Sequence, residues 1–366
     1  QPMNAFDTAA VLIAIAALTG YINHRVLKLS ATTGTLAVAL VSSLVIVVAD
    51  AAVPGWKLQA VLTGFLGGID FNEALMHGML CFLLFAGSLH IDLEGLLEHK
   101  WTIGALATVG VVISTLVVGT CTWWALGLFG VDIPFVICLV FGSLISPTDP
   151  IAVMGLLKEL KAPRGLEAQI AGESLFNDGI AVVVFFALVS VAGLSGAGSA
   201  EAITVSAGGL ASFFVQEVAG GALLGLGFGY VGYHAIKSIN DHSLELLITL
   251  ALVMFMYTVS FWLHVSGPIA VVLAGLLIGN PGRAFAMSDT TREHVDAFWQ
   301  MVGEILNAVL FLLLGLEVFA VPAGPGAIAA SLLVVPIVLV ARFVSVSVPI
   351  TAMSLRGPYR RGIVPI

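Results

Sequence analysis

Long apolar stretches separated by short polar segments run along the whole chain of 366 residues. A helix needs about 20 predominantly apolar residues to cross the hydrocarbon core of a bilayer. The pattern therefore predicts about eleven spanning helices, the ninth of them short. Their expected ranges are 8–27, 32–53, 71–91, 101–126, 133–157, 164–193, 207–236, 243–265, 267–280, 298–320 and 325–355. The loops are too short for a separate soluble domain, so we expect one all-α, polytopic membrane domain over residues 1–366.

Composition supports this interpretation. Hydrophobic residues make up 59% of the chain and charged residues only 10%, with a mean hydropathy of +1.08. An ordinary soluble domain carries roughly 25% charged residues, so a water-soluble globular fold is excluded. Cys81, Cys121 and Cys138 lie within apolar stretches without paired or metal-like spacing, and are expected to be small buried residues.

Lysine and arginine residues are concentrated in every second predicted loop. Cytoplasmic loops of membrane proteins collect these residues. Lys57 lies in an even-numbered loop and Arg342 within the last apolar stretch. The other twelve of the fourteen lie in odd-numbered loops or the tail: Arg25, Lys28, Lys100, Lys158, Lys161, Arg164, Lys237, Arg283, Arg292, Arg356, Arg360 and Arg361. We therefore expect a multi-pass protein of the cell (plasma or inner) membrane with its N-terminus outside.

The fifth apolar stretch is interrupted by prolines. Thr148 and Asp149 lie between Pro147 and Pro150 in an otherwise apolar run. Two prolines so close remove backbone donors and clash with the preceding turn, so the helix is expected to unwind there. Freed backbone groups at membrane depth are tolerated only where protein or a water-filled cavity satisfies them, a feature of transporter sites. The alternative is a simple kink in which Asp149 caps the following half-helix.

The sixth stretch carries four polar side chains on one side of its predicted helix. Ser174 and Asp178 are four residues apart, and Glu173 and Asn177 form a second such pair. Ionisable residues within a membrane are costly and usually face a cavity that conducts ions or protons. A structural network of buried hydrogen bonds is the alternative.

These residues could bind a monovalent cation. Hard cations prefer oxygen ligands, which Asp178, the hydroxyls of Ser174 and Thr148, and unwound carbonyls would supply to Na⁺. Because the carboxylate also takes a proton, cation and proton would compete for one site, and alternating access would make an antiporter. Asn177 beside Asp178 is not a second acid, which favours electroneutral exchange unless Asp149 or Glu173 also titrates.

Arg342 needs a partner, since an unpaired guanidinium within a membrane is costly. Glu173 is our first choice and Glu304 the second, because a buried arginine usually pairs with a carboxylate. If Arg342 holds Glu173, that carboxylate is structural. The roles of four further polar residues stay open at this point: Glu73, His77, His90 and Glu304.

Together these motifs resemble the NhaP-type sodium/proton antiporters of the monovalent cation:proton antiporter superfamily, relatives of the sodium/hydrogen exchangers. The resemblance extends over essentially the whole chain and is carried by residues 146–150, residues 172–179 and Arg342. It implies that Glu173 and Arg342 are the family's buried ion pair. The ion-binding and transport residues that it implies are Asp178, Asn177, Ser174, Thr148 and Asp149.

The resemblance also implies a fold of two inverted repeats with a discontinuous helix, and a homodimer. Core elements would lie around 101–194 and 298–355, and dimerisation elements around 8–53 and 207–280. Such antiporters have about thirteen spans, so the last two helices are expected to be missing here. Many relatives carry an acid in the third span where this chain has Ala86, which bears on the choice among sodium, lithium and potassium.

Two alternatives to sodium/proton exchange stay open at this point. A potassium/proton exchanger of the same fold is the main competitor, and an intramembrane aspartyl protease using Asp149 and Asp178 is a remote one. No nucleotide loop, dinucleotide fingerprint or metal-ligand spacing occurs, so we expect no organic cofactor, no enzymatic activity and no nucleic-acid partner.

Overall fold

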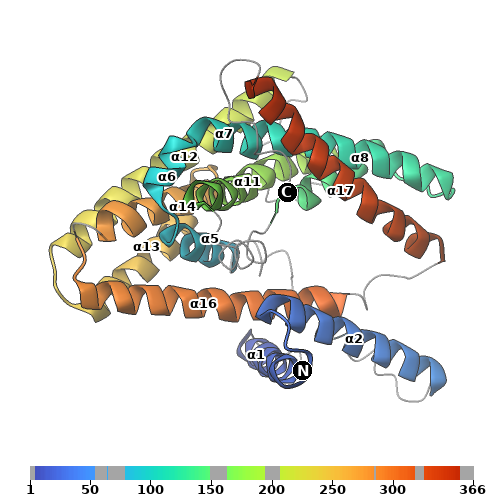
Figure 1. Cartoon of the computed structure of the whole chain (residues 1–366), viewed down its shortest axis with the longest axis horizontal. Coiled ribbons are helices and arrows are strands. Elements are labelled where there is room, and N and C mark those ends of the chain that lie inside the picture. Colours follow the sequence, from blue (N-terminus) through green and yellow to red (C-terminus); the bar gives the residue numbers. More distant parts are fainter. Residues whose placement is uncertain are drawn as a thin grey trace. The chain divides into compact units, whose positions relative to one another are not determined.

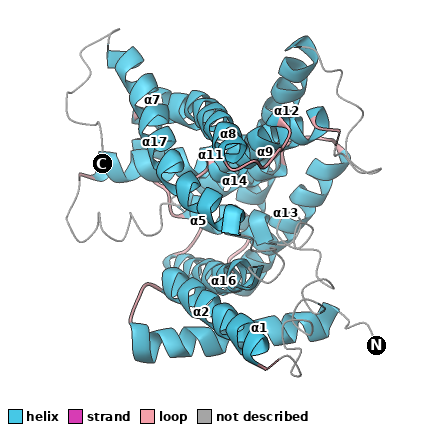
Figure 2. Ribbon diagram, turned by 90° about the vertical axis from the view of Figure 1, so that its right-hand side faces the viewer, coloured by secondary structure: helices cyan, strands magenta, loops and turns pink. Residues whose placement is uncertain are grey.

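The computed structural model describes residues 5–53, 64, 79–148, 163–193, 207–283, 286–317 and 325–354. Every element within these ranges is a helix, as Figure 2 shows, which confirms the predicted all-α class. By their internal contacts the residues form two compact units. The first comprises Gln1–Ala86 and Glu293–Ala323, and the second comprises Gly87–Arg292 and Gly324–Ile366.

The first unit is built from the two N-terminal helices and a late helix. Its elements are α1 (Ala5–Ile22), the π-helical segment η1 (Asn23–Leu27), α2 (Ala31–Ala52), most of α5 (Leu80–Leu89) and most of α16 (Asp289–Leu316). The remaining residues of α5 and α16 are counted with the second unit.

The second unit contains the middle of the chain and the last described helix. Its elements are α6 (Leu93–Glu98), α7 (Lys100–Ala105), η3 (Leu106–Gly110), α8 (Val111–Leu128), α9 (Phe135–Ile145), α11 (Arg164–Val191), α12 (Ala207–Lys237), α13 (His242–Trp262), α14 (Gly267–Leu277), η4 (Ile278–Gly282) and α17 (Pro325–Ser354). In Figure 1, α11 is seen nearly end-on beside α14, with which it is in contact.

The described helices agree with the predicted spans in position. Eight of them are long and apolar enough to cross a membrane. The described residues also hold three shorter apolar helices, Leu80–Leu89, Phe135–Ile145 and Gly267–Gly282. Each predicted span overlaps one of these eleven helices. The number of crossings stays a prediction, because parts of the third and fifth spans lie outside the described residues.

A small apolar core joins α1, α2 and α16 in the first unit. Its buried members are Leu12, Ala16, Ala39, Leu312, Leu313 and Leu316. At Gly315 the helices touch so closely that an added Cβ would overlap the side chain of Ala39. The hydroxyl of Ser43 donates to the carbonyl oxygen of Gly315 at 2.9 Å, so α2 is also tied to α16 by a buried hydrogen bond.

Glycines let α12 and α14 pack backbone against backbone in the second unit. Gly221, Gly225 and Gly229 follow one another at four-residue spacing on α12. A Cβ at Gly221 would lie 2.5 Å from the carbonyl oxygen of Ser266, and one at Gly225 would overlap that of Ala270. Small residues at this spacing allow close approach of membrane helices, whose association depends on packing rather than on a hydrophobic driving force.

We expect Gly225→Ala to lower the stability of the protein by about 1–3 kcal/mol, because the added methyl group forces α12 away from α14. The measurement is thermal unfolding of the purified protein in detergent. Gly227→Ala is the matched control on the same helix, since a Cβ there meets no atom within 4 Å. Alanine is a better helix former than glycine, so Gly227→Ala should be neutral or slightly stabilising. Equal midpoints for the two variants would contradict the packing described here.

Candidate ion-binding site

Helix α9 ends at Ile145, two residues before Pro147. Proline lacks a backbone N–H and its ring clashes with the preceding turn, so a helix ends readily at this point. Residues 146–148 are not helical, in agreement with the interruption predicted from the proline pair. Asp149 and Pro150 lie outside the described residues, so the predicted role of Asp149 stays a prediction.

The end of α9 is fixed against α8. A Cβ at Gly142 would lie 2.5 Å from the carbonyl oxygen of Thr115 and 3.0 Å from the backbone nitrogen of Gly119, so the two helices are in backbone contact. The buried hydroxyl of Ser146 donates to the carbonyl oxygen of Gly142 at 2.6 Å and lies 3.3 Å from the Thr115 hydroxyl. These contacts hold the segment that leads to Thr148.

The four predicted polar residues of α11 lie on consecutive turns of an unbroken helix. Glu173, Ser174 and Asn177 have exposed fractions of 5%, 1% and 0%, and Asp178 is half-buried. Burial of this many polar groups requires hydrogen-bond partners, because an unsatisfied polar group in an apolar environment is costly.

Two residues of α11 bind the non-helical segment that follows α9. The hydroxyl of Ser174 donates to the carbonyl oxygen of Thr148. The amide of Asn177 donates from Nδ2 to the hydroxyl oxygen of Thr148 at 3.2 Å. Thr148, Ser174 and Asn177, which the sequence placed in one site, are therefore in direct contact.

Glu173 is bound through both carboxylate oxygens. Arg342 of α17 places Nη2 2.7 Å from Oε2, and Asn177 donates from Nδ2 to Oε1 at 2.9 Å. The side chain of Glu173 is 7% exposed and that of Arg342 is 32% exposed. The arginine thus lies beside the partner that we ranked first. The second choice, Glu304, is exposed and accepts a hydrogen bond from Gln300 at 3.0 Å.

The site contains several oxygen atoms that a cation could use as ligands. The side-chain oxygen of Asn177, Oδ1, is buried and has no hydrogen-bond partner among the described residues. The hydroxyl oxygens of Thr148 and Ser174 lie next to it in the network, and the Asp178 carboxylate follows Asn177 in the chain. Neutral oxygens together with one carboxylate form a donor set that suits a hard monovalent cation.

The other polar candidates lie elsewhere. Glu73 and His77 are outside the described residues. His90 is exposed in the turn that follows α5. Sequence reasoning missed Thr115, whose hydroxyl braces Ser146, because a threonine in an apolar run carries no signal of its own.

Comparison with known proteins places the chain among transporters. The family model described as "Sodium/hydrogen exchanger, transmembrane" matches residues 13–357. The chain is 45% identical to the Na⁺/H⁺ antiporter NhaP of Pseudomonas aeruginosa over 97% of this chain and 82% of that protein. It is 34% identical to the Na⁺/H⁺ antiporter NhaH of Halobacillus dabanensis over 68% of this chain and 59% of that protein.

The fold also matches a solved structure. The sodium proton antiporter MjNhaP1 from Methanocaldococcus jannaschii at pH 8 superposes with a TM-score of 0.72 at 16% identity, over 99% of this chain and 83% of that one. At this identity the match concerns the fold, which is the antiporter fold that the sequence motifs predicted. Members of this family are transporters and not enzymes, which excludes the aspartyl protease. The chain therefore belongs to the transmembrane sodium/hydrogen exchanger family.

Proposed function

We propose that this protein exchanges one sodium ion for one proton across the cell membrane, with Asp178 binding either ion in turn. The observation that carries the proposal is the engagement of Glu173 on both oxygens by Arg342 and Asn177. A carboxylate held in this way is structural, which leaves Asp178 as the carboxylate beside Asn177 that takes cation or proton.

Exchange follows from competition for this carboxylate. Sodium bound at Asp178 takes further oxygens from Ser174, Thr148 and Asn177, of which Asn177 Oδ1 is buried and unpartnered within the described structure. A proton on Asp178 removes the charge that holds the cation, so the two ions are not bound together. One proton exchanged for one monovalent cation moves no net charge, and transport is electroneutral.

The ions reach the site from opposite sides by alternating access. The core elements around 101–194 and 298–355 carry the site, and the elements around 8–53 and 207–280 form the scaffold and dimer contact. The N-terminus faces outward. The names of the relatives support sodium as the cation, and lithium is the expected second substrate because it is also a small hard cation.

The test is proton movement in proteoliposomes driven by outward gradients of sodium, lithium or potassium. We expect sodium to drive proton uptake and potassium to give the rate of protein-free liposomes. An imposed membrane potential should leave the sodium-driven rate unchanged. A rate that rises with the potential would reject one-for-one exchange, and a potassium-driven rate above that for sodium would favour the potassium/proton alternative.

We expect Ser174→Ala to raise the KM for sodium about tenfold, since one lost oxygen contact is worth about 1–1.5 kcal/mol. The maximal rate should change less, because Asp178 is still present. Ser190→Ala, near the C-terminal end of the same helix, is the matched control and should leave KM unchanged. An unchanged KM in Ser174→Ala would remove this hydroxyl from the site.

A further inference from the structure

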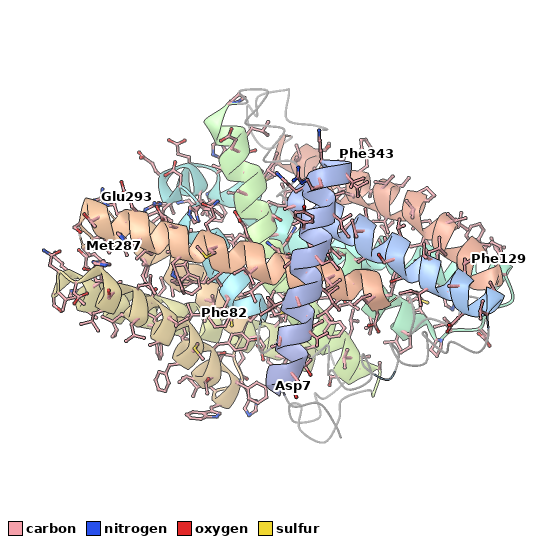
Figure 3. All side chains as sticks on the ribbon, turned by 90° about the horizontal axis from the view of Figure 1, so that it is seen from below. Asp7, Phe82, Phe129, Met287, Glu293 and Phe343 are labelled. Atoms are coloured by element: carbon pink, nitrogen blue, oxygen red, sulfur yellow. The ribbon has the colours of Figure 1, made fainter. Side chains whose placement is uncertain are left out.

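A groove in the first unit has apolar walls and a basic end. It is a cavity of about 980 Å³ between α1, the turn into α2, and α16. Ile13 and Ala17 of α1 and Ile305 and Val309 of α16 line it with apolar side chains. Figure 3 shows α1 crossing α16, with Asp7 at the end of α1 opposite this turn. None of the groove residues belongs to the ion-binding site.

Three basic side chains line the same groove where α1 passes into α2. They are His24, Arg25 and Lys28, and all three are exposed. The guanidinium carbon of Arg25 lies 5.9 Å from the centre of the Tyr21 ring, close enough for a cation–π interaction. The groove thus combines a cationic end with an apolar body.

The basic turn is held in one shape by Asn23, which is 5% exposed. Its Nδ2 donates to the carbonyl oxygen of Leu29 at 3.1 Å, and its Oδ1 accepts from the backbone N–H of the same residue at 3.2 Å. Lys28 adopts a left-handed backbone conformation, with its N–H bonded to the carbonyl oxygen of Asn23 at 2.7 Å. These bonds hold the backbone that carries the basic side chains, so less of the turn has to be ordered when an anion binds.

We propose that this groove binds one anionic phospholipid, with the phosphate at Arg25 and Lys28 and an acyl chain along the apolar walls. The partner must be amphiphilic, because a soluble anion would leave the walls exposed and a neutral lipid would leave the cations unpaired. Clusters of basic residues at the membrane surface attract anionic headgroups. Glu304 also lines the groove and would repel a phosphate, which directs the headgroup toward the basic turn.

The orientation of the chain agrees with this occupant. Arg25 and Lys28 belong to the loops that collect twelve of the fourteen basic residues, which we expect to face the cytoplasm. That leaflet carries the negative surface potential that draws basic segments to it. The site requires no transport activity, so it can be tested independently of the proposed exchange.

The test is thermal unfolding of the full chain in detergent micelles supplemented with phosphatidylglycerol or phosphatidylcholine. We expect phosphatidylglycerol to raise the unfolding midpoint more than phosphatidylcholine does, and the difference to shrink in high salt. Arg25→Gln/Lys28→Gln should abolish the difference. Lys100→Gln/Lys237→Gln removes two exposed lysines outside the groove and should preserve it.

A second variant tests the apolar wall without removing charge. Gly20 lines the groove, and a Cβ there meets no atom within 4 Å, so Gly20→Leu fills the groove without a clash at Cβ. We expect this variant to keep its lipid-free midpoint and to lose the shift caused by phosphatidylglycerol. Gly227→Leu, equally open but on α12, should keep the shift.

Two results would overturn the proposal. One is a shift by phosphatidylglycerol that survives both the charge and the groove-filling variants. The other is conversion of a dimer into monomers by Gly20→Leu with the lipid shift intact, because the occupant of the groove would then be a second copy of the chain.

Discussion

Replacing Asp178 with asparagine is expected to reduce sodium-driven proton movement in proteoliposomes at least roughly a hundredfold, a typical cost of losing a proton-transferring group. An amide neither takes up a proton at cellular pH nor carries the charge that holds sodium. Sodium binding should weaken in the same variant. The measured quantity is the initial rate of pH change inside the vesicles after a sodium gradient is applied.

A matched carboxylate separates this effect from a general loss of charge. Asp132 is exposed in the loop between α8 and α9, and Asp132→Asn makes the same chemical change outside the site. It should leave the rate unchanged. Folding of both variants is checked by their unfolding midpoints in detergent. If Asp178→Asn folds and retains most of the wild-type rate, another carboxylate carries the proton and the proposed mechanism is wrong.

Replacing Arg342, the positive partner of Glu173, with methionine is expected to lower the free energy of unfolding by about 3 kcal/mol. Breaking a buried ion pair leaves one charge uncompensated, and such losses are typically about 3–5 kcal/mol. The lower end applies to Arg342→Met, because the arginine side chain is 32% exposed and water already reaches part of it. Thermal or denaturant unfolding in detergent measures the loss.

The double variant Glu173→Gln/Arg342→Met, with Glu173→Gln as the second single variant, distinguishes a broken pair from a local packing defect. The amide that replaces the Glu173 carboxylate still offers an oxygen to Asn177 Nδ2 and leaves no buried charge. We expect the double variant to be more stable than Arg342→Met, and the two sites to show a coupling energy of about 1–3 kcal/mol in a double-mutant cycle. Additive effects would mean that the 2.7 Å contact contributes little.

Rules that concern a single helix or a single residue were sufficient to predict much of the candidate site. The four-residue spacing of Glu173 and Asn177 on a helix predicts a contact, and Asn177 donates to Glu173 at 2.9 Å. Pro147 predicts an interruption, and α9 ends two residues before it. The cost of a lone guanidinium in a membrane predicts a carboxylate partner for Arg342. The sequence left two candidates, with Glu173 preferred over Glu304.

Other features depend on which helices become neighbours, and spacing along one helix does not contain that information. The hydroxyl contact between Thr115 and Ser146 joins two residues that neither periodicity nor charge brings together. Taken alone, Gly225 is an unfavourable residue for a helix. Its role becomes clear only from the structure, in which the backbone of Ala270 leaves no space for a Cβ. The groove beside Gly20 likewise exists only because α16, late in the chain, packs against α1.

The pairing of Glu173 with Arg342 also has a consequence for synthesis of the protein. The two residues are 169 positions apart, and ribosomes add roughly 5–20 residues per second. Arg342 is therefore synthesised roughly 10–30 seconds after Glu173. During that interval Glu173 lacks its cationic partner, so we expect α11 to stay in contact with insertion machinery or with neighbouring helices. The ion pair between α11 and α17 can therefore form only after α17 has been translated.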